Sequence, residues 1–262
     1  MAYHSFELSV TDGLARIVLN QPEAGNPIND SFCDEILQIA NELSGRQDLR
    51  AVLMTARGKF FSVGGDVQMF SQNLDTLPSK IRKWTSDIHM ALARLARLDA
   101  PLVAAVHGTA MGGAVAMVSN CDVVYAGRSA KFGAAYAQIG YSCDAGSSTG
   151  LASRMGLARA RRFMLLSEML TAEEAGQAGL VDFVVDDAAL QAEAEKAAIK
   201  LSRGPTRAYG EIRRVVSRAL GQPFETQLEE EAQGLARMAG TADAREGITA
   251  FVEKRKPNFK GY

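Results

Sequence analysis

The sequence predicts an α/β protein whose C-terminal part is helical. Short apolar runs alternate with helical patterns up to about residue 126, and the signals from Ser147 onward are almost wholly helical. The runs at 51–55, 102–106 and 123–125 lack the polar alternation of a half-exposed strand, which favours strands that are covered on both faces. Strands of this kind, separated by helices, indicate an α/β core.

A hairpin and a capped helix are expected first. Alternating apolar residues over 6–10, the turn sequence Thr11-Asp12-Gly13 and a mostly apolar run over 14–19 predict two strands joined by a tight turn. Either Asn29 or Asp30 is suited to cap the helix that follows. The apolar face of that helix recurs at helical spacing: Phe32, Ile36, Ile39 and Leu43.

The middle of the chain contains a longer helix and a second, buried one. The longer helix is expected from about residue 80 to residue 98. Its apolar side repeats at helical spacing: Trp84, Ile88, Leu92 and Leu95. The strand at 102–106 leads into Gly112-Gly113, after which residues 114–118 are able to begin a buried helix.

The C-terminal part is expected to be a set of amphipathic helices. Thr171-Ala172-Glu173-Glu174 has the form of a capping box, and Gly179 supplies the matching stop. Residues 180–185 are the last strand-like run. Helical patterns then follow at about 187–202, 205–220, 224–239 and from Thr241 onward. We therefore expect a core over residues 1–195 and a helical region over residues 196–262.

Composition and charge exclude several classes of protein. The 29 lysine and arginine residues nearly cancel the 30 aspartate and glutamate residues, so we expect neither nucleic acid nor a membrane surface as partner. Residues 1–10 lack a basic and apolar leader, and no run reaches the roughly 18 apolar residues of a membrane span. These features predict a cytoplasmic protein. The three cysteines have no metal-ligand spacing and are expected to be reduced thiols: Cys33, Cys121 and Cys143.

Two Gly-Gly pairs, each preceded by an apolar segment, are the most informative motif. One is Gly64-Gly65, which follows Phe60 to Val63, and the other is Gly112-Gly113, which follows the segment from Val106. Each pair would leave main-chain N–H groups uncovered at a strand end or helix start. Two such groups are able to converge on one developing oxyanion. The pattern is that of an enzyme.

A series of motifs in fixed order covers nearly the whole chain. They lie at residues 19–23, 61–66, 101–113, 120–124, 130–133, 170–180 and 250–256. In these motifs the chain resembles the crotonase superfamily, also called the enoyl-CoA hydratase/isomerase family. The resemblance implies a crotonase-type spiral of ββα turns in the core. It also implies a helical C-terminal trimerisation region, assembly as a homotrimer or homohexamer, and acyl-CoA thioesters as substrates that pass through an enolate.

The same resemblance implies which residues form the site. The N–H groups of Gly65 and Gly113 would donate to the thioester oxygen. Further substrate contacts would come from Ala24, Ser62, Gly64, Asp66, Val67, Gly112, Tyr136 and Tyr141. Phe251 and Lys254 would reach the CoA of a neighbouring subunit, the lysine through a phosphate. Coenzyme A is part of the substrate, so no separate cofactor and no metal is expected.

The catalytic side chains favour a double-bond shift over hydration. The two glutamates that hold water in the family's hydratases are replaced by Ala116 and Tyr136. Asp144 stands where the similar dienoyl-CoA isomerases and ring-1,2-epoxyphenylacetyl-CoA isomerases are acidic. A shift needs only one base, because the proton taken from one carbon is returned to another. Asp144 would do both, and desolvation beside Tyr136 would raise its pKa.

Four alternatives remain open from the sequence. In the first, Asp144 serves only as a cap of the helix near Ser147. In the similar 4-chlorobenzoyl-CoA dehalogenases a matching aspartate attacks the ring and a histidine matching His89 activates water. Against this, His89 lies on the apolar side of its helix, where a packed, hydrogen-bonded histidine is expected. A strict enoyl-CoA hydratase and a non-catalytic acyl-CoA binder are the remaining hypotheses.

Overall fold

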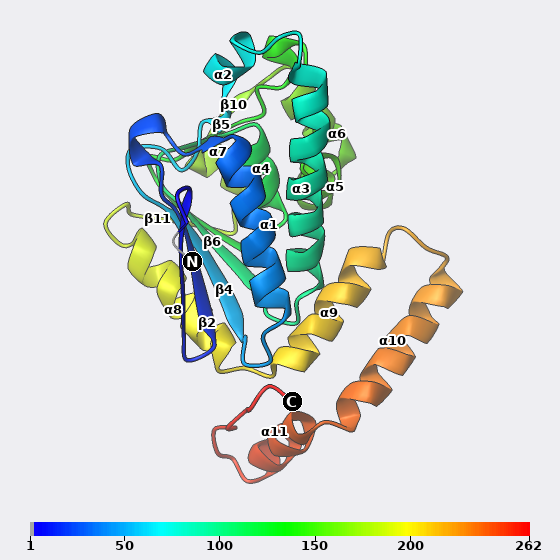
Figure 1. The fold of residues 1–262 in the computed structure, drawn as a ribbon. Coiled ribbons are helices and arrows are strands. Elements are labelled where there is room, and N and C mark those ends of the chain that lie inside the picture. The colour runs from blue at the N-terminus through cyan, green and yellow to red at the C-terminus, as the bar shows by residue number, and fades with distance from the viewer. Residues whose placement is uncertain (1–2) are drawn as a thin grey trace.

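A six-stranded sheet forms the centre of the computed structural model, which describes residues 3–262 (Figure 1). In spatial order its strands are β1 (Phe6–Thr11), β2 (Leu14–Leu19), β4 (Ala51–Ala56), β6 (Leu102–Val106), β8 (Val123–Gly127) and β11 (Phe183–Val185). The first pair is the predicted antiparallel hairpin, and every later pair is parallel. The α/β prediction is confirmed.

Both faces of this sheet are covered, which explains the missing polar alternation. On β4, Val52 and Met54 belong to the large core cluster, whereas Ala51 and Leu53 belong to a second cluster. Helices α1 (Asp30–Ser44) and α3 (Leu77–Arg97) lie side by side over the first face (Figure 1). Helix α8 (Leu190–Ser202) covers the second face through residues such as Leu190 and Ala194. Burial on both sides requires apolar residues at successive positions.

Helix starts and stops follow local chemistry. Asn29, not Asp30, caps α1, because its side chain accepts a hydrogen bond from the N–H of Phe32 at 3.1 Å. Helix α3 begins at Leu77 rather than near residue 80, with a proline in its first turn. The predicted capping box is present at the start of α7 (Ala172–Gln177).

The last strand begins later than expected. The sequence predicts it from Leu180, but β11 starts at Phe183. The N–H groups of Leu180 and Val181 both donate to the carbonyl of Ala175 and thereby close the end of α7. These two N–H groups are therefore not available to a sheet.

Small sheets and short helices lie beyond one end of the main sheet, and among them the sequence predicted only the buried helix that follows Gly112. Strands β7 (Thr109–Met111), β9 (Lys131–Gly133) and β10 (Met169–Thr171) form one small sheet, and β3 (Pro27–Ile28) pairs with β5 (Gly64–Gly65) in another. Such strands are too short to show a periodicity. The remaining short elements near them are η1 (Pro22–Ala24), α2 (Val67–Ser71), α4 (Gly113–Ser119) and η2 (Ala137–Ile139). These elements build the site described below.

The rest of the chain after the site is helical. The helices are α5 (Ser147–Met155), α6 (Leu157–Leu165), α9 (Thr206–Arg218), α10 (Phe224–Ala239) and α11 (Ala242–Val252). Helices α9 and α10 pack against each other and lead to α11 at the far end from α2 (Figure 1). The expected boundary at residue 195 falls within α8, and the division into two domains stays a prediction. Within residues 3–262, no helix is both long and apolar enough to cross a membrane.

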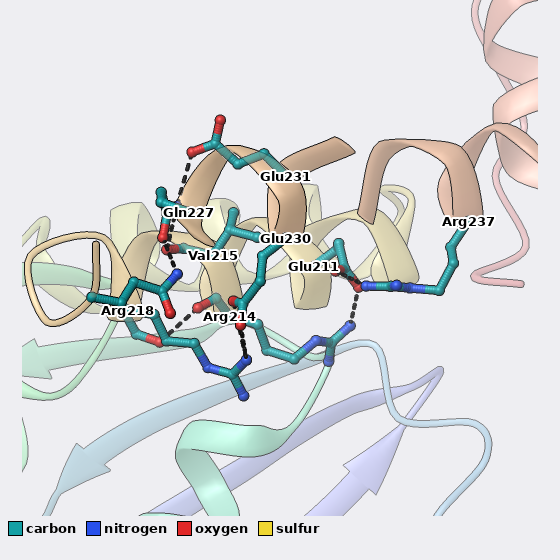
Figure 2. Close-up of polar contacts among 10 residues, drawn as sticks. Glu211, Arg214, Val215, Arg218, Gln227, Glu230, Glu231 and Arg237 are labelled. Carbon is teal, nitrogen blue, oxygen red and sulfur yellow. Dashed lines mark hydrogen bonds and ion pairs between the residues drawn. The ribbon is translucent and has the colours of Figure 1, made fainter. Parts of the chain in front are cut away.

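A buried carboxylate joins helices α9 and α10. Glu211 on α9 is only 9% exposed and accepts hydrogen bonds from Arg214 at 2.9 Å and from Arg237 of α10 at 2.6 Å (Figure 2). Arg214 also pairs with Asp99 at 2.6 Å. Gly234 makes this approach possible, because an added Cβ would lie 2.7 Å from the Glu211 carboxylate. The hydrogen bonds that Glu211 accepts from the two arginines lower its pKa, and the bond from Arg214 has the largest effect.

Replacing Glu211 by glutamine should therefore destabilise the α9–α10 pair. At pH 7 we expect the free energy of unfolding to fall by about 1–3 kcal/mol, because a buried charge-assisted hydrogen bond is lost. The pKa of Glu211 is lowered because the folded state stabilises its ionised form. The difference in free energy of unfolding between wild type and variant should therefore vanish as pH falls through that pKa, below the ordinary value of 4.5.

Urea denaturation at one fixed protein concentration checks this expectation. Glu229→Gln, an exposed change on α10, is the matched control and should shift the free energy of unfolding by less than about 0.5 kcal/mol. Equal effects of the two variants would contradict the role of Glu211 in joining α9 to α10.

Candidate active site

The two glycine pairs lie against each other. The N–H of Ser62 donates to the carbonyl of Thr109 at 3.2 Å, and the N–H of Met111 donates to the carbonyl of Ser62 at 3.0 Å. Gly64 has a φ of +79°, and a Cβ on it would lie 2.6 Å from the carbonyl oxygen of Met111. Only glycine allows both this conformation and this close approach. Gly64-Gly65 is therefore held beside Gly112-Gly113.

A buried asparagine fixes the loop that leads into the first glycine pair. Asn26 is 2% exposed, and its side-chain amide donates to three main-chain carbonyls of that loop. The acceptors are the carbonyls of Arg57, Phe60 and Phe61, at 2.9, 3.0 and 3.1 Å. The hydroxyl of Ser62 donates back to the Asn26 carbonyl at 2.7 Å. Asn26 could not be singled out from the sequence, since a single asparagine in a polar stretch gives no distinct signal.

The candidate oxyanion donors lie at a strand end and at a helix start. Gly65 ends β5 and precedes Asp66, which caps α2. Gly113 is the first residue of α4, and the N–H groups of a helix's first turn have no partner within the helix. The helix dipole adds positive potential at the same point. This arrangement suits the stabilisation of a negative oxygen.

A cavity of about 940 Å³ opens beside the two glycine pairs. Its wall is mainly apolar and includes Phe70, Trp84 and Tyr141. The Phe70 ring stacks on Trp84 with a centroid distance of 5.8 Å and on Tyr141 with one of 5.9 Å. Both Gly65 and Gly113 border the cavity. The site therefore offers main-chain donors at the edge of a largely apolar space.

Asp144 lies in this cavity close to the second glycine pair. Its Oδ1 accepts a hydrogen bond from the Tyr136 hydroxyl at 2.9 Å and is 3.9 Å from the position that a Cβ on Gly113 would occupy. Ser147 bonds to the main-chain carbonyl of Asp144, and the residue before α5 is Gly146. The hypothesis that the Asp144 side chain only caps this helix is therefore wrong.

The surroundings of Asp144 shift the pKa of its carboxyl upward. Burial raises the pKa of its carboxyl above the ordinary value of 3.8. The hydrogen bond from Tyr136 and the potential of His89 lower this pKa, but they do not cancel the effect of burial. Burial, assisted by the nearby Asp144 charge, also raises the pKa of Tyr136, so its hydroxyl stays a neutral donor.

His89 has a different environment from the one predicted. It is hydrogen-bonded as expected, since its Nε2 accepts from the N–H of Ala145 at 3.0 Å. The expectation that it is packed in the core is wrong, because the ring is exposed and borders the cavity. A ring nitrogen that accepts an N–H is unprotonated, which assigns the proton of neutral His89 to Nδ1.

Two alanines in the left-handed region flank the segment that carries Tyr136 and Asp144. Ala135 has a φ of +56° and Ala145 has a φ of +49°. Each such residue costs roughly 1–2 kcal/mol relative to a right-handed conformation. Strain of this kind persists where the surrounding structure over-determines it, and it clusters at active sites. These conformations could not be predicted from the sequence, because alanine has no preference for this region.

The structure gathers eight of the proposed site residues around the cavity. They are Gly64, Gly65, Val67, Gly112, Gly113, Tyr136, Tyr141 and Asp144. Ser62 is fully buried behind this wall, and Asp66 accepts a hydrogen bond from the N–H of Met69 at 2.9 Å. Ala24 is exposed in η1, outside the cavity wall.

The two remaining predicted residues lie far from this cavity in the same chain. Phe251 on α11 is 86% exposed, and Lys254 follows the end of that helix. Helix α11 is at the opposite end of the molecule from α2 and β5 (Figure 1). Neither Phe251 nor Lys254 borders the cavity. Across residues 3–262, no cluster of three histidine, cysteine or acidic side chains is arranged to hold a metal ion.

Comparison with known proteins identifies the family. The model of the enoyl-CoA hydratase/isomerase family matches residues 9–262, so the chain belongs to this family. The 1,2-epoxyphenylacetyl-CoA isomerase of Escherichia coli (strain K12) is 33% identical over 259 residues, covering 96% of this chain and 97% of that protein. The 2,3-dehydroadipyl-CoA hydratase of the same organism is 32% identical over 254 residues, covering 94% of each chain.

A solved structure confirms the predicted fold. The enoyl-CoA hydratase from Bacillus anthracis matches with a TM-score of 0.91 at 26% identity, covering 99% of this chain and 100% of that one. The crotonase-type fold is thus confirmed, and the chain is an acyl-CoA enzyme of the hydratase/isomerase family. Its named relatives include both hydratases and isomerases.

Gly64→Ala should weaken the contact between the two glycine pairs. The new Cβ would meet the Met111 carbonyl at 2.6 Å, and the backbone would remain left-handed. We expect the free energy of unfolding to fall by about 2 kcal/mol or more. Gly240→Ala is the control, because its nearest neighbour, the Arg237 carbonyl, is 3.5 Å away. Chemical denaturation of both variants measures the difference, and a stable Gly64→Ala protein would refute this account.

Proposed function

We propose that the protein is an enoyl-CoA isomerase that shifts a double bond by proton transfer through Asp144. One observation carries the proposal: within residues 3–262, Asp144 is the only acidic side chain that borders the cavity. A double-bond shift needs one group that takes and returns a proton, whereas hydration also needs a group that activates water. A single carboxylate beside two main-chain donors therefore supports isomerisation.

In this mechanism the main chain holds the charge and Asp144 moves the proton. The N–H groups of Gly65 and Gly113 donate to the thioester oxygen and stabilise the enolate that develops there. Asp144 removes an α-proton from a 3-enoyl ester, and the electron pair moves into the dienolate. The protonated Asp144 then returns the proton to the γ-carbon, which gives the 2-enoyl ester. A raised pKa makes this carboxylate a stronger base.

The two positions that hold water in related hydratases argue against hydration. Ala116 is fully buried in α4 and has no proton to exchange. The hydroxyl of Tyr136 is committed to Asp144. A dehalogenase-like reaction is also disfavoured, because it requires His89 to activate water and the Nε2 of His89 already accepts the N–H of Ala145.

The position of α11 supports a role in a neighbouring subunit's site. Phe251 and Lys254 are exposed at the end of the chain that is remote from the cavity. Exposed apolar side chains on the same helical region include Leu220, Phe224 and Leu235. Their burial in a homotrimer or homohexamer would bring the aromatic ring and the lysine of one subunit to the CoA of another.

Asp144→Asn tests the assignment of the base. With a 3-enoyl-CoA ester we expect kcat/KM to fall by about 100-fold or more, since an amide cannot accept the α-proton. Asp186→Asn, a change at an exposed side chain, should leave turnover at the wild-type level. The appearance of the conjugated 2-enoyl ester is followed by absorbance. Wild-type turnover in Asp144→Asn would exclude the proposed mechanism.

Two further assays separate the alternatives. Loss of enoyl absorbance from crotonyl-CoA would reveal a hydratase. Deuterium exchange at the α- or γ-carbon distinguishes an isomerase from an acyl-CoA binder, which would bind the ester without exchange. We expect exchange in wild type and none in Asp144→Ala.

The pH dependence should report the environment of Asp144. Because its ionised form is the base, kcat/KM should fall on acidification through a pKa above the ordinary value of 3.8. This acid limb should be absent from the residual activity of Asp144→Asn. The measurement is kcat/KM against pH, over the range in which circular dichroism shows an intact fold. A limb at or below the ordinary aspartate value would contradict the buried site.

A further inference from the structure

We propose that Tyr136 and His89 are positioning residues that clamp Asp144 from two sides and leave it one free oxygen for proton transfer. Tyr136 holds the carboxylate, and His89 holds the main chain directly after it. This inference rests on the proposed function, because it gives these two residues their role in the same isomerisation. It also explains why a tyrosine at position 136 favours a double-bond shift.

The first arm of the clamp is the Tyr136 hydroxyl. It donates to Oδ1 of Asp144 at 2.9 Å, while Oδ2 accepts no hydrogen bond from the residues that the structure describes. Tyr136 also borders the cavity, so its ring supports the acyl group while its hydroxyl orients the acid. The proton taken from the substrate then forms its new O–H bond at Oδ2 as the α C–H bond breaks.

The second arm of the clamp is the His89 ring. Its Nε2 accepts the N–H of Ala145 at 3.0 Å, and Ala145 is one of the two left-handed alanines. His89 is held by α3, which packs into the core through Trp84 and Ile88. A long, anchored helix thus fixes the main chain at one of its left-handed residues. Protonated His89 would carry a donor at Nε2 and would lose this bond.

The clamp limits the chemistry to one proton. Proton removal and return both use Oδ2, as a shift from the α-carbon to the γ-carbon requires. A water molecule placed for addition would need a second acceptor, but the Tyr136 hydroxyl directs its hydrogen to Oδ1. The Tyr136 hydroxyl therefore orients the base, and it does not serve as the second acceptor that water addition would need.

The groups that face Asp144 determine the expected pH response. They are Tyr136 before η2, His89 on α3, Cys143 and Ser147 on its own segment, and the positive end of α4 at Gly113. Of these, the Tyr136 hydroxyl is the hydrogen-bond donor to the carboxylate itself. Removing it takes away a bond that favours the ionised form, so the pKa of Asp144 should rise.

Tyr136→Phe tests the first arm. With a 3-enoyl-CoA ester we expect kcat to fall by about 10- to 100-fold, KM to change by less than about threefold, and the acid limb to move to higher pH. Tyr125→Phe is the matched control, since this ring packs on Phe183 away from the cavity, and it should leave both values unchanged. A purely structural role would lower the melting temperature without moving the acid limb.

Two variants of His89 test the second arm independently. In His89→Gln the amide oxygen still accepts the N–H of Ala145, so kcat should stay within about threefold of wild type. In His89→Leu the acceptor is lost, and kcat should fall by about 10-fold or more. Equal losses in the two variants would mean that His89 acts as a base, which would overturn its assignment here.

Asp144→Asn, assayed beside these variants, separates the test of the clamp from the test of the proposed isomerase function. If Asp144→Asn is inactive while Tyr136→Phe keeps the wild-type kcat and acid limb, the clamp is refuted and the isomerase proposal stands. If Asp144→Asn is fully active, the proposed function itself fails. Loss of activity in Asp144→Asn, a shifted limb in Tyr136→Phe and rescue by His89→Gln together support the clamp.

Discussion

The close contact between the two glycine segments is the constraint on which the site depends. Ser62 exchanges main-chain hydrogen bonds with Thr109 and Met111, and Gly64 packs directly on the Met111 carbonyl. No side chain fits between them, so the peptide groups that follow each segment are brought to one edge of the cavity. Asn26 completes this arrangement, because its amide ties down the loop that would otherwise be free to move the first pair.

The acid is placed by a different principle. Asp144 lies in a largely apolar cavity, where an ionised carboxylate loses hydration, and burial raises its pKa as a result. The hydroxyl of Tyr136 returns part of that lost stabilisation without adding charge. The carboxylate thus remains ionisable, yet it is a stronger base than one in water. The segment that places the carboxylate here has strained, left-handed conformations at Ala135 and Ala145.

The sequence predicted the main elements well and the smaller ones poorly, for physical reasons. The strands at 51–55 and 102–106 and the capping box at Thr171 have strong local signals and are found in the structure. Strands of two or three residues, such as β5, owe their pairing to distant segments and leave no periodicity in the sequence.

At the candidate site, residue identity was informative and detailed environment was not. The glycine pairs and Asp144 stood out in the sequence, and the structure gathers them around one cavity. The exposure of His89 and the hydroxyl bond between Tyr136 and Asp144 depend on how α3 and the segment after β9 meet, which no local pattern encodes.

Phe70 adds a last consequence, since its ring occupies the space where a Gly65 side chain would begin, with Cζ 2.7 Å from that point. An acyl chain too wide for the stacked rings would push on the same peptide that we propose to bind the thioester oxygen. The enzyme would therefore discriminate against an ill-fitting substrate through slower turnover as well as weaker affinity. The shape of the acyl chain would in this way influence the reactivity of the thioester.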